Sequence, residues 1–421
     1  MKIKLAVMFG GKSVEHEISV ISAIQAIHSI DEEKYDVITI YITKNNEMYI
    51  GEFIDNIDYY KDIDNLLSMS IRVNLINDGS KTLIVKYPHK LFAKDVVDYI
   101  DVAFPIVHGT NVEDGTLQGY LSMLNLPYVG CDVVSSAVGM DKYVMKTVLK
   151  DNDIPVLDCI IATSFEYSED PESIIEKVKN RFEFPLIVKP VNLGSSIGIS
   201  KARDLDSLEE ALDTAFSYTD RVIIEPAIEN LREINCSVLG DRENAKASVC
   251  EEPLNASDIL SFEDKYIGNA SGAGAKGGAK VGSKGIAPKL AGAKAAGGKL
   301  GSQGMASASR RIPADIPIET EREIKEMAVK AFKVLGCNGV SRIDFMIDAD
   351  TNKVWLNEIN TIPGSLSFYL WEPAGLKYPE LIDEMISLAL KRQREQETIT
   401  YSFDSNVLSG IKLGGKKTGK M

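Results

Sequence analysis

The sequence predicts an α/β protein whose N-terminal part is a parallel sheet with helical crossovers. An apolar run at residues 4–9 leads through a glycine turn into a helical pattern at about 13–29. Two further apolar runs, residues 37–42 and 101–107, read as strands. Strands separated by helices in this way imply parallel pairing.

Ligands of parallel α/β sheets bind beyond the carboxyl ends of the strands. In this chain the first strand ends at Gly10-Gly11 and the strand at 101–107 is followed by His108-Gly109. We therefore expect the N-terminal part to contribute to an active site at these two turns.

Composition excludes several classes of protein. The 421 residues suffice for two or three domains, and a formal net charge of −14 argues against general nucleic-acid binding. The five cysteines show no CxxC spacing, so neither a zinc cluster nor a disulfide framework is indicated. No run approaches the roughly 18 apolar residues of a membrane span, and the first apolar run is too short for a signal peptide. We expect a cytoplasmic protein that binds neither nucleic acid nor membranes.

A second unit begins with a helix near Asp141, followed by a strand at 184–190 that carries Lys189 near its end. A glycine and serine loop follows at 194–198. A lysine beside such a loop can hold a phosphate while backbone N–H groups cover it. The loop alone is more often a plain turn, and Lys189 is what favours a phosphate site.

Two carboxylates mark the following strands. Glu225 lies near the end of an apolar strand at 221–227, and Glu233 precedes another at 234–239. They could accept hydrogen bonds from an adenine amino group and from ribose hydroxyls, respectively. Their positions alone equally fit surface carboxylates at strand ends.

Two short apolar runs near the C-terminus carry polar side chains at alternating positions. Arg342 and Asp344 share one face of the first run, and Glu358 and Asn360 share one face of the second. If the runs pair as a hairpin across residues 348–352, three oxygen ligands and one guanidinium converge. Such oxygen donors suit Mg²⁺, and unpaired polar groups in an apolar strand would be costly. The pattern predicts a magnesium site for phosphate activation.

Six motifs occur together, and their order resembles that of the D-alanine–D-alanine ligases of the ATP-grasp superfamily over roughly residues 3–395. The motifs are Gly-Gly-x-Ser-x-Glu-x-Glu at 10–17, His-Gly-x-x-x-Glu-Asp-Gly-Thr-Leu-Gln-Gly at 108–119, Met-Asp-Lys at 140–142, Val-Lys-Pro at 188–190 with Gly-Ser-Ser-x-Gly at 194–198, Lys-Tyr at 265–266, and Asn-Glu-x-Asn-Thr-x-Pro-Gly at 357–364.

The resemblance implies an α/β and α+β architecture, the ATP-grasp fold with an N-terminal Rossmann-like parallel-sheet domain. The expected divisions are an N-terminal domain at 1–131, a central subdomain at 132–224, a C-terminal subdomain at 225–395 with a flexible insertion at 268–304, and a disordered tail at 396–421. The implied activity is ATP-dependent joining of two D-alanines through an acyl phosphate, for peptidoglycan precursor synthesis. Family members are commonly dimers, so a homodimer is expected by analogy.

The resemblance also implies a role for each matching residue at the substrates. Glu15 would hold the ammonium of the first D-amino acid, with His108 beside it. Ser195, Ser196 and Tyr266 would close over that substrate.

Further roles concern the intermediate and the second substrate. Arg342 and the backbone of Gly364 would stabilise the tetrahedral intermediate, and Tyr369 and Leu370 would line the acceptor site. His16 has no such role, and we expect it to face solvent or to cap a helix.

For ATP and the metal the resemblance implies two groups of residues. The nucleotide would contact Lys142, Lys189 and Lys265 at its phosphates and Glu225, Ala227 and Glu233 at adenine and ribose, while Asp344, Glu358 and Asn360 would bind two Mg²⁺ ions or Mn²⁺ in their place.

Two departures from the family leave alternatives open. The insertion after Lys265-Tyr266 is rich in Gly, Ala and Lys and is either inert or brings a lysine to the ATP phosphates. Tyr369 stands where the family usually has a serine that anchors the acceptor's carboxylate. A D-alanine–D-serine or other D-amino-acid ligase, or a nucleotide-binding protein without ligase activity, therefore remain alternatives. Tyr266 resembles dipeptide-forming members, which favours an amine acceptor.

Overall fold

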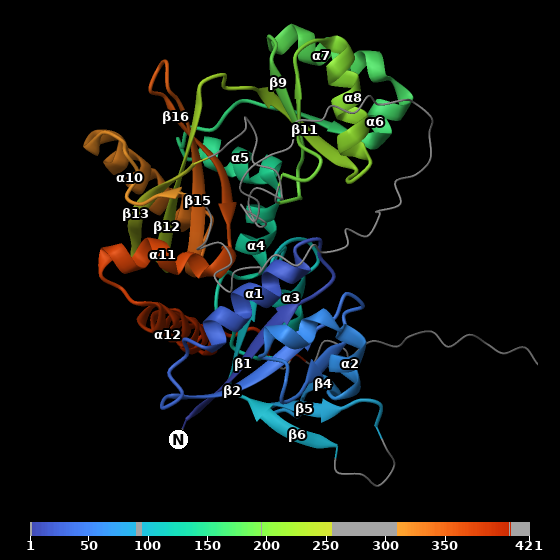
Figure 1. Ribbon diagram of the computed structural model, residues 1–421, viewed down its shortest axis with the longest axis vertical. Helices are drawn as coiled ribbons and strands as arrows, with labels where there is room; N and C mark the ends of the chain where they lie inside the picture. The colour runs from blue at the N-terminus through green and yellow to red at the C-terminus, as the bar shows by residue number, and fades with distance from the viewer. Residues whose placement is uncertain (1, 90–94, 195, 255–309, 404, 406–421) are drawn as a thin grey trace, which may run out of the picture.

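The computed structural model describes residues 2–89, 95–194, 196–254, 310–403 and 405. Three sheets follow one another along the chain. In Figure 1 the N-terminal sheet lies lowest, the central sheet lies at the top right, and the C-terminal sheet lies at the left, between them in height. Lys265, Tyr266, Ser195 and the insertion at 268–304 lie outside the described residues. No helix of the described part is long and apolar enough to cross a membrane.

The N-terminal sheet has seven strands in the order β6-β5-β4-β3-β2-β1-β7. Only β1 with β2 and β1 with β7 pair in parallel, so the sheet is mixed rather than parallel throughout. The reason is that the chain from β2 to β6 returns through antiparallel pairings that need no helical crossover. The elements are β1 (Ile3–Gly10), α1 (His16–Ile27), β2 (Tyr35–Ile42), β3 (Met48–Ile50), η1 (Ile57–Lys61), α2 (Ile63–Ser68), β4 (Ile71–Asn77), β5 (Thr82–Lys86), β6 (Val96–Ile100), β7 (Val102–Ile106) and α3 (Thr116–Met123).

Glycine is required where β1 turns toward α1. Gly10 and Gly11 have φ of +93° and +94°, in the region that favours glycine. A Cβ on Gly10 would lie 2.2 Å from the carbonyl oxygen of Ile42 on β2. The turn at the carboxyl end of β1 therefore cannot carry a side chain at this point.

The central sheet has four antiparallel strands in the order β10-β9-β11-β8. Asp141 caps the N-terminus of α5, the helix that precedes this sheet in the chain, because its side chain accepts from the backbone N–H groups of Tyr143 and Val144. The strand β11 ends at Pro226, two residues beyond the division expected at 224. The elements are α4 (Val133–Met140), α5 (Lys142–Asp151), β8 (Ile160–Thr163), α6 (Ser164–Glu169), α7 (Pro171–Arg181), β9 (Leu186–Pro190), β10 (Ser200–Ala202), α8 (Leu205–Phe216) and β11 (Arg221–Pro226).

The C-terminal sheet has five strands in the order β14-β13-β12-β15-β16. Asp348 closes the hairpin between β15 and β16, because its carbonyl accepts from the N–H of Asn352 at 2.7 Å. The elements are β12 (Leu231–Gly240), β13 (Ala245–Pro253), β14 (Arg310–Arg311), α10 (Ile318–Val334), β15 (Gly339–Asp348), β16 (Val354–Asn360), η3 (Gly364–Ser367), α11 (Phe368–Trp371), η4 (Glu372–Ala374) and α12 (Tyr378–Glu397).

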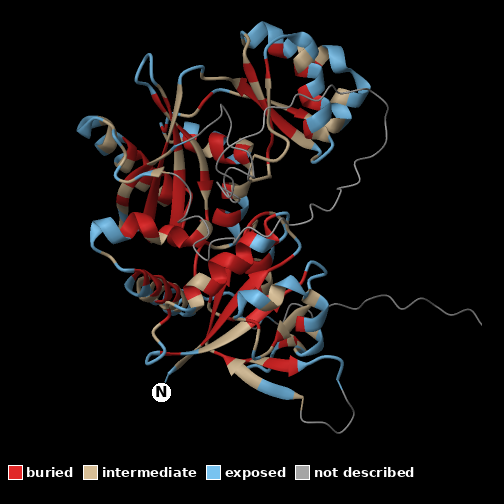
Figure 2. Ribbon diagram, viewed as in Figure 1, coloured by how far each residue is buried: buried red, intermediate tan, exposed pale blue. Residues whose placement is uncertain are grey.

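Apolar packing joins the N-terminal sheet to the end of the chain. One buried cluster contains side chains of β1 and β7 together with Leu366, Trp371 and the α12 residues Leu381 and Met385. The central sheet with α7 and α8 has a buried cluster of its own. Figure 2 shows these interiors as buried strands and helix faces inside an exposed outer surface.

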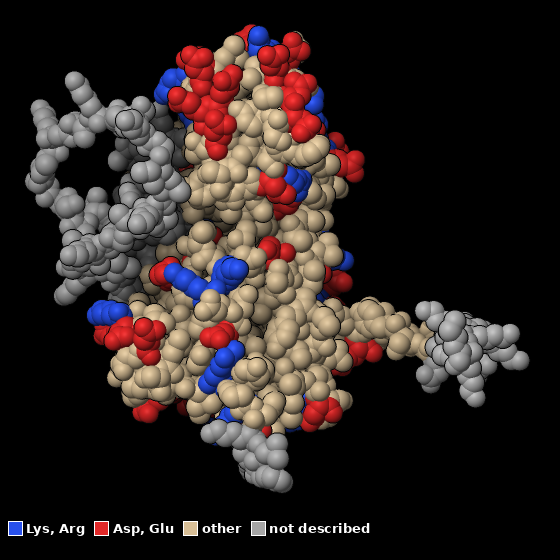
Figure 3. Space-filling model, turned by 90° about the vertical axis from the view of Figure 1, so that its right-hand side faces the viewer, with Lys and Arg blue, Asp and Glu red and all other residues tan. Residues whose placement is uncertain are grey.

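Charge is unevenly distributed on the surface. Acidic side chains gather over the lobe formed by α6, α7 and α8, at the top of Figure 3. This concentration agrees with the negative net charge of the sequence.

Candidate active site

The predicted C-terminal hairpin is confirmed. Strands β15 and β16 pair with Arg342 opposite Asn360 and Asp344 opposite Glu358. Arg342 donates from Nε and Nη2 to the two carboxylate oxygens of Asp344, at 2.7 Å each. Asn360 donates from Nδ2 to Oδ2 of Asp344 at 3.0 Å. The expected carboxylate, amide and guanidinium groups therefore lie together on one face of the hairpin.

A bulge in β16 brings one more side chain to this site. The register shifts so that Asn357 is an extra residue between Leu356, which pairs with Phe345, and Glu358. Lys189 of β9 donates to Oδ1 of Asn357 at 3.0 Å. Strict alternation along the strand places Asn357 on the other face, so its place in the site was not predicted from the sequence.

Two lysines from the central unit converge on β16. Lys142, the first residue of α5, approaches Glu358 with 3.5 Å between Nζ and Oε2 and donates to the carbonyl of Leu193 at 2.7 Å. Lys189 approaches the neighbouring residue Asn357. Two cations and the acidic hairpin thus face one another, as expected of a site for phosphates and a divalent ion.

Glu225 is buried between two lysines. Its carboxylate accepts from Lys189 and from Lys146 of α5, with N–O distances of 2.5 Å. Burial acts to raise the pKa of Glu225, but the charges of Lys146 and Lys189 outweigh it and lower the pKa to about 2. Lys146 was not predicted from the sequence, although its position one helical turn after Lys142 is a signal for it.

The other residues expected around adenine and ribose lie on neighbouring segments. The N–H of Ala227 donates to the carbonyl of Pro185 at 3.0 Å. Glu233 pairs with Met346 across β12 and β15, two positions along the ladder from the pairing of Asn235 with Asp344. Glu233 therefore shares the sheet face of the hairpin carboxylate.

Glu15 lies between two glycine turns. It precedes α1 and is only 7% exposed. A Cβ on Gly109 would lie 2.8 Å from its Oε2, and a Cβ on Gly194 would lie 3.0 Å from the same atom. The carboxylate therefore contacts both the turn after β7 and the loop after β9, where Ser196 has a positive φ of +59°.

His108 contacts the C-terminal part of the chain. Its Nδ1 lies 2.9 Å from the carbonyl oxygen of Ile362, and its Nε2 lies 2.9 Å from Oγ of Ser22. Burial lowers its pKa to about 4, so the ring is neutral at pH 7. Both ring nitrogens of His108 contact protein groups, and the expected contact of His108 with substrate stays a prediction.

The expectation for His16 was wrong. The side chain is buried under β1 and β2, with Nδ1 2.7 Å from the carbonyl oxygen of Gly11 and Nε2 2.9 Å from the hydroxyl of Tyr41. Burial lowers the pKa of His16. It faces inward because α1 packs this side against the sheet, where both ring nitrogens find partners.

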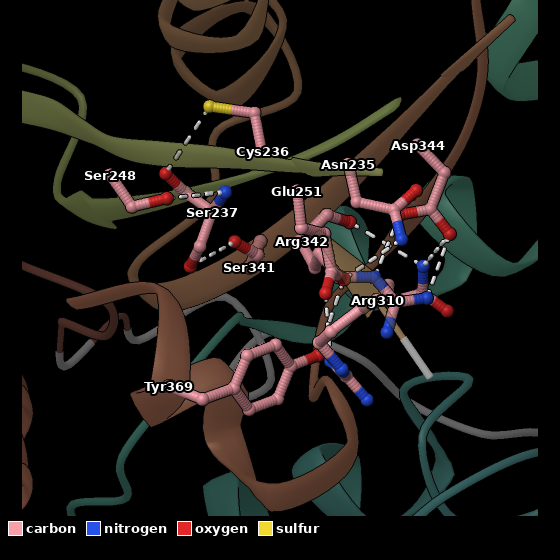
Figure 4. Close-up of polar contacts among 11 residues, drawn as sticks. Asn235, Cys236, Ser237, Ser248, Glu251, Arg310, Ser341, Arg342, Asp344 and Tyr369 are labelled. Atoms are coloured by element: carbon pink, nitrogen blue, oxygen red, sulfur yellow. Dashed lines mark hydrogen bonds and ion pairs between the residues drawn. The ribbon is translucent and has the colours of Figure 1, made fainter. Parts of the chain in front are cut away.

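Tyr369 faces a polar cluster next to Arg342 (Figure 4). Its hydroxyl lies 3.4 Å from Oε1 of Glu251, and the Arg310 guanidinium lies 4.1 Å from the centre of its ring. Arg310 also donates to Oε2 of Glu251 at 2.7 Å, and Asn235 donates to Oε1 at 3.0 Å.

Arg342 and Leu370 lie in surroundings of different polarity. Burial opposes the charge on Arg342, but Asp344, Tyr369 and Glu251 together raise its pKa above the ordinary value. Leu370, beside Tyr369, is fully buried, so its side chain belongs to the core.

The fold and the site together define an ATP-grasp enzyme. In this class two sheets, here the central and C-terminal ones, face each other around lysines and an acidic hairpin, and ligation is driven by ATP.

Comparison with known proteins identifies the family. The family model described as D-ala D-ala ligase N-terminus matches residues 4–131, and the one described as D-ala D-ala ligase C-terminus matches residues 148–284 and 299–387. The D-alanine–D-alanine ligase of Thermosipho melanesiensis is 37% identical, with 98% of this chain and 99% of the relative covered. That of Caldicellulosiruptor bescii is 39% identical, with 95% and 99% covered. The chain belongs to the D-alanine–D-alanine ligase family, and it is an ATP-dependent ligase.

Solved structures agree with this assignment. The D-alanine–D-alanine ligase from Coxiella burnetii matches with a TM-score of 0.73 and 30% identity, covering 94% of this chain and 96% of that one. The VanG D-Ala:D-Ser ligase from Enterococcus faecalis matches with a TM-score of 0.72 and 29% identity, covering 92% and 100%. The predicted ATP-grasp fold and ligase function are confirmed.

Proposed function

We propose that this chain condenses two D-alanines with the residues described above, through an acyl phosphate. The observation that carries the proposal is the meeting of Lys142 and Lys189 with the acidic hairpin at Glu358 and Asn357. A carboxylate is a poor electrophile, and its attack on ATP brings anions together. The two lysines offset that repulsion, as does the ion that the hairpin would hold.

The hairpin fits Mg²⁺. Asp344, Glu358 and Asn360 offer two carboxylates and one amide oxygen. Only two of these three ligands are His, Cys, Asp or Glu side chains, and the described residues contain no group of three such side chains that could hold a metal. Mg²⁺ usually takes one or two carboxylates and fills its other positions with water and phosphate oxygens. Bound there, two Mg²⁺ ions, or Mn²⁺, would neutralise charge on the transferred phosphoryl group.

The reaction then proceeds in two steps, phosphoryl transfer and amine attack. A carboxylate oxygen of the first D-alanine, whose ammonium is held by Glu15, attacks the γ-phosphorus, and ADP leaves. The amine of the second D-alanine, after it releases a proton to water, attacks the carbonyl carbon of the acyl phosphate, and the C–O bond to phosphate breaks as phosphate leaves. Arg342 and the N–H of Gly364 stabilise the oxyanion of this second step.

Replacement of Arg342 by alanine tests the assignment. We expect Arg342→Ala to lower dipeptide turnover on the order of 10² to 10³-fold, with a much smaller change in ATP affinity. Arg322→Ala on the exposed side of α10 is the matched control, because Arg322 is 74% exposed. Unchanged turnover in Arg342→Ala would rule out the assigned role.

The acceptor is D-alanine, and D-serine is the alternative that Tyr369 raises. The Tyr369 hydroxyl is oriented toward Glu251, and Tyr369 is expected to line the acceptor site. Removal of this hydroxyl should therefore alter the acceptor site more than the donor site. Chromatography of products from paired D-amino acids, with phosphate release measured alongside, distinguishes the two ligases. Phosphate release that does not depend on any D-amino acid would favour the binding protein without ligase activity. By family analogy the enzyme is a cytoplasmic homodimer. Sedimentation velocity of the purified protein tests whether it is a dimer.

A further inference from the structure

The backbone of Ile362 is held at both of its polar atoms by residues of the N-terminal domain. Its N–H donates to Oε1 of Glu113 at 2.9 Å, and its carbonyl lies 2.9 Å from Nδ1 of His108. A carbonyl only accepts, so Nδ1 of His108 carries the proton. The loop that leads to Gly364 is therefore attached from across the domain boundary.

The other ring nitrogen extends this attachment to the far side of Gly364. With Nδ1 protonated and the ring neutral, Nε2 of His108 accepts, and its partner at 2.9 Å is the hydroxyl of Ser22 on α1. Oγ of Ser22 in turn accepts from the N–H of Ser365 at 3.1 Å. We term Ser22, His108 and Glu113 the interdomain clamp. In each of these hydrogen bonds the donor and the acceptor are fixed.

Glu113 strengthens the clamp with two more bonds. Oε1 accepts from the hydroxyl of Thr361 at 3.2 Å, and Oε2 accepts from the N–H of Gly109 at 2.9 Å. Burial, together with the charge of Glu15, raises the pKa of Glu113 to about 8 although these donors oppose the rise. The side chain is 7% exposed and contacts backbone and hydroxyl groups of both domains.

The clamp holds a strained turn. Ser365, Leu366 and Ser367 have φ of +52°, +50° and +50°, and none of them is glycine. Left-handed backbone is unfavourable for residues that carry a Cβ, and a conformation of this kind persists only where its surroundings impose it. Gly364 lies between the clamped residue Ile362 and this turn, so the direction of its N–H depends on both.

We infer that Ser22, His108 and Glu113 are positioning residues that aim the Gly364 N–H at the oxyanion of the second step. The inference rests on the proposed role of Gly364. A misplacement of about 1 Å in a positioned group can cost on the order of 10² in rate. Loss of the Ser22 hydroxyl should therefore slow amine attack and leave phosphoryl transfer to the first D-alanine nearly unchanged.

Ser22→Ala is the direct test, because it removes the hydroxyl that joins Ser365 to His108. Two rates are compared at D-alanine concentrations below acceptor saturation. The first is dipeptide formation. The second is D-alanine-dependent scrambling of ¹⁸O from the β,γ-bridge of ATP, which reports reversible formation of ADP and acyl phosphate. We expect the first to fall on the order of 10²-fold and the second, with the KM for ATP, to change by less than about threefold.

Three further variants keep the test decisive. Ser29→Ala removes a hydroxyl from the same helix region outside the clamp, where it bonds Gln25, and should change neither rate. Glu113→Ala removes both acceptor oxygens, so the N–H of Ile362 loses its partner, and this variant should reproduce the split. His108→Asn retains a donor near the Nδ1 position and should restore part of the dipeptide rate that His108→Ala loses.

Equal losses in both rates, or an unchanged dipeptide rate in folded Ser22→Ala and Glu113→Ala, would overturn the inference. Failure of the proposed function gives a different result, since the unsubstituted enzyme would then neither scramble the label nor form dipeptide.

Discussion

At the scale of single residues, the site depends on buried charges that compensate one another. Glu225 is 2% exposed and Lys146 is 3% exposed, so neither could remain charged without its partner. Lys189 makes the second ion pair with Glu225 and also contacts Asn357. Lys189 is therefore not the only cation beside Glu225, which agrees with the phosphate-binding role that we propose for Lys189.

Lys146→Met should destabilise the protein. The variant leaves Glu225 with one cation in place of two, and we expect a loss of about 2 kcal/mol in the free energy of unfolding, below the roughly 3–5 kcal/mol of a fully broken buried pair. Lys150→Met on the same helix is the control, because Lys150 is 71% exposed and its pair with Asp158 is long, at 3.7 Å. Urea denaturation measures both, and equal effects would contradict the compensating role.

The same pair predicts an acid response. The pKa of Glu225 is lowered from 4.5 to about 2 in the folded state. Its contribution to stability is therefore fully present above about pH 4.5 and is lost as the pH falls toward 2. In Lys146→Met the folded pKa should rise, so less of this contribution exists and acid unfolding should begin at a higher pH. An acid transition at the same pH in both proteins, followed by circular dichroism, would refute this cause.

At the scale of elements, the sequence predicted the regular strands well. The ranges expected for β1, β2, β7, β9, β11 and β12 agree with the structure within a few residues, because apolar runs bounded by turns carry that information. The convergence of Arg342, Asp344, Glu358 and Asn360 also followed from alternation. What alternation could not give was the bulge at Asn357, although Leu356 and Ile359 both face the core at a spacing of three, which a regular strand forbids.

Long-range contacts were the information that the sequence lacked. Glu113 and Glu225 are both buried glutamates, yet the pKa of the first is raised and that of the second is lowered. The difference depends on which charges fold against them, Glu15 in one case and two lysines in the other. His16 was misassigned for the same reason, since its partner Tyr41 is supplied by a different strand.

The left-handed turn after Gly364 gives a prediction for one element. Ser367 has φ of +50°, and its buried hydroxyl has no hydrogen-bond partner within the described part of the chain. Ser367→Gly relieves both defects and should raise the free energy of unfolding by about 1 kcal/mol. Ser367→Ala is the control that removes the hydroxyl and keeps the strain, so it should gain less. A loss of stability in Ser367→Gly, measured by thermal unfolding, would contradict the strain argument.

At the scale of the whole molecule, the three sheets are not equally connected. The N-terminal sheet and α12 share one apolar cluster, so we expect them to open as one cooperative unit. Arg392 of α12 adds a polar connection, because it donates to the carbonyl of Gly130 at 2.6 Å and to that of Tyr128 at 2.5 Å. The central sheet has a separate cluster and meets its neighbours through polar contacts such as that of Lys189 with Asn357.

Native-state hydrogen exchange should therefore resolve two units. Amides of β1, β7 and α12 should exchange with one common free energy of opening, and those of β9 and β11 with a smaller one, because burial of apolar surface sets the cost of opening. A non-hydrolysable ATP analogue contacts the central and C-terminal sheets in the proposed site, so saturating analogue should raise the smaller value by about 2.7 kcal/mol at one hundred times Kd. Arg392→Ala should lower the protection of α12 and β7 together while β9 is unchanged. If all three sheets opened with a single free energy before nucleotide was added, the central sheet would already open together with the rest, and nucleotide binding could not act by joining it to the C-terminal sheet.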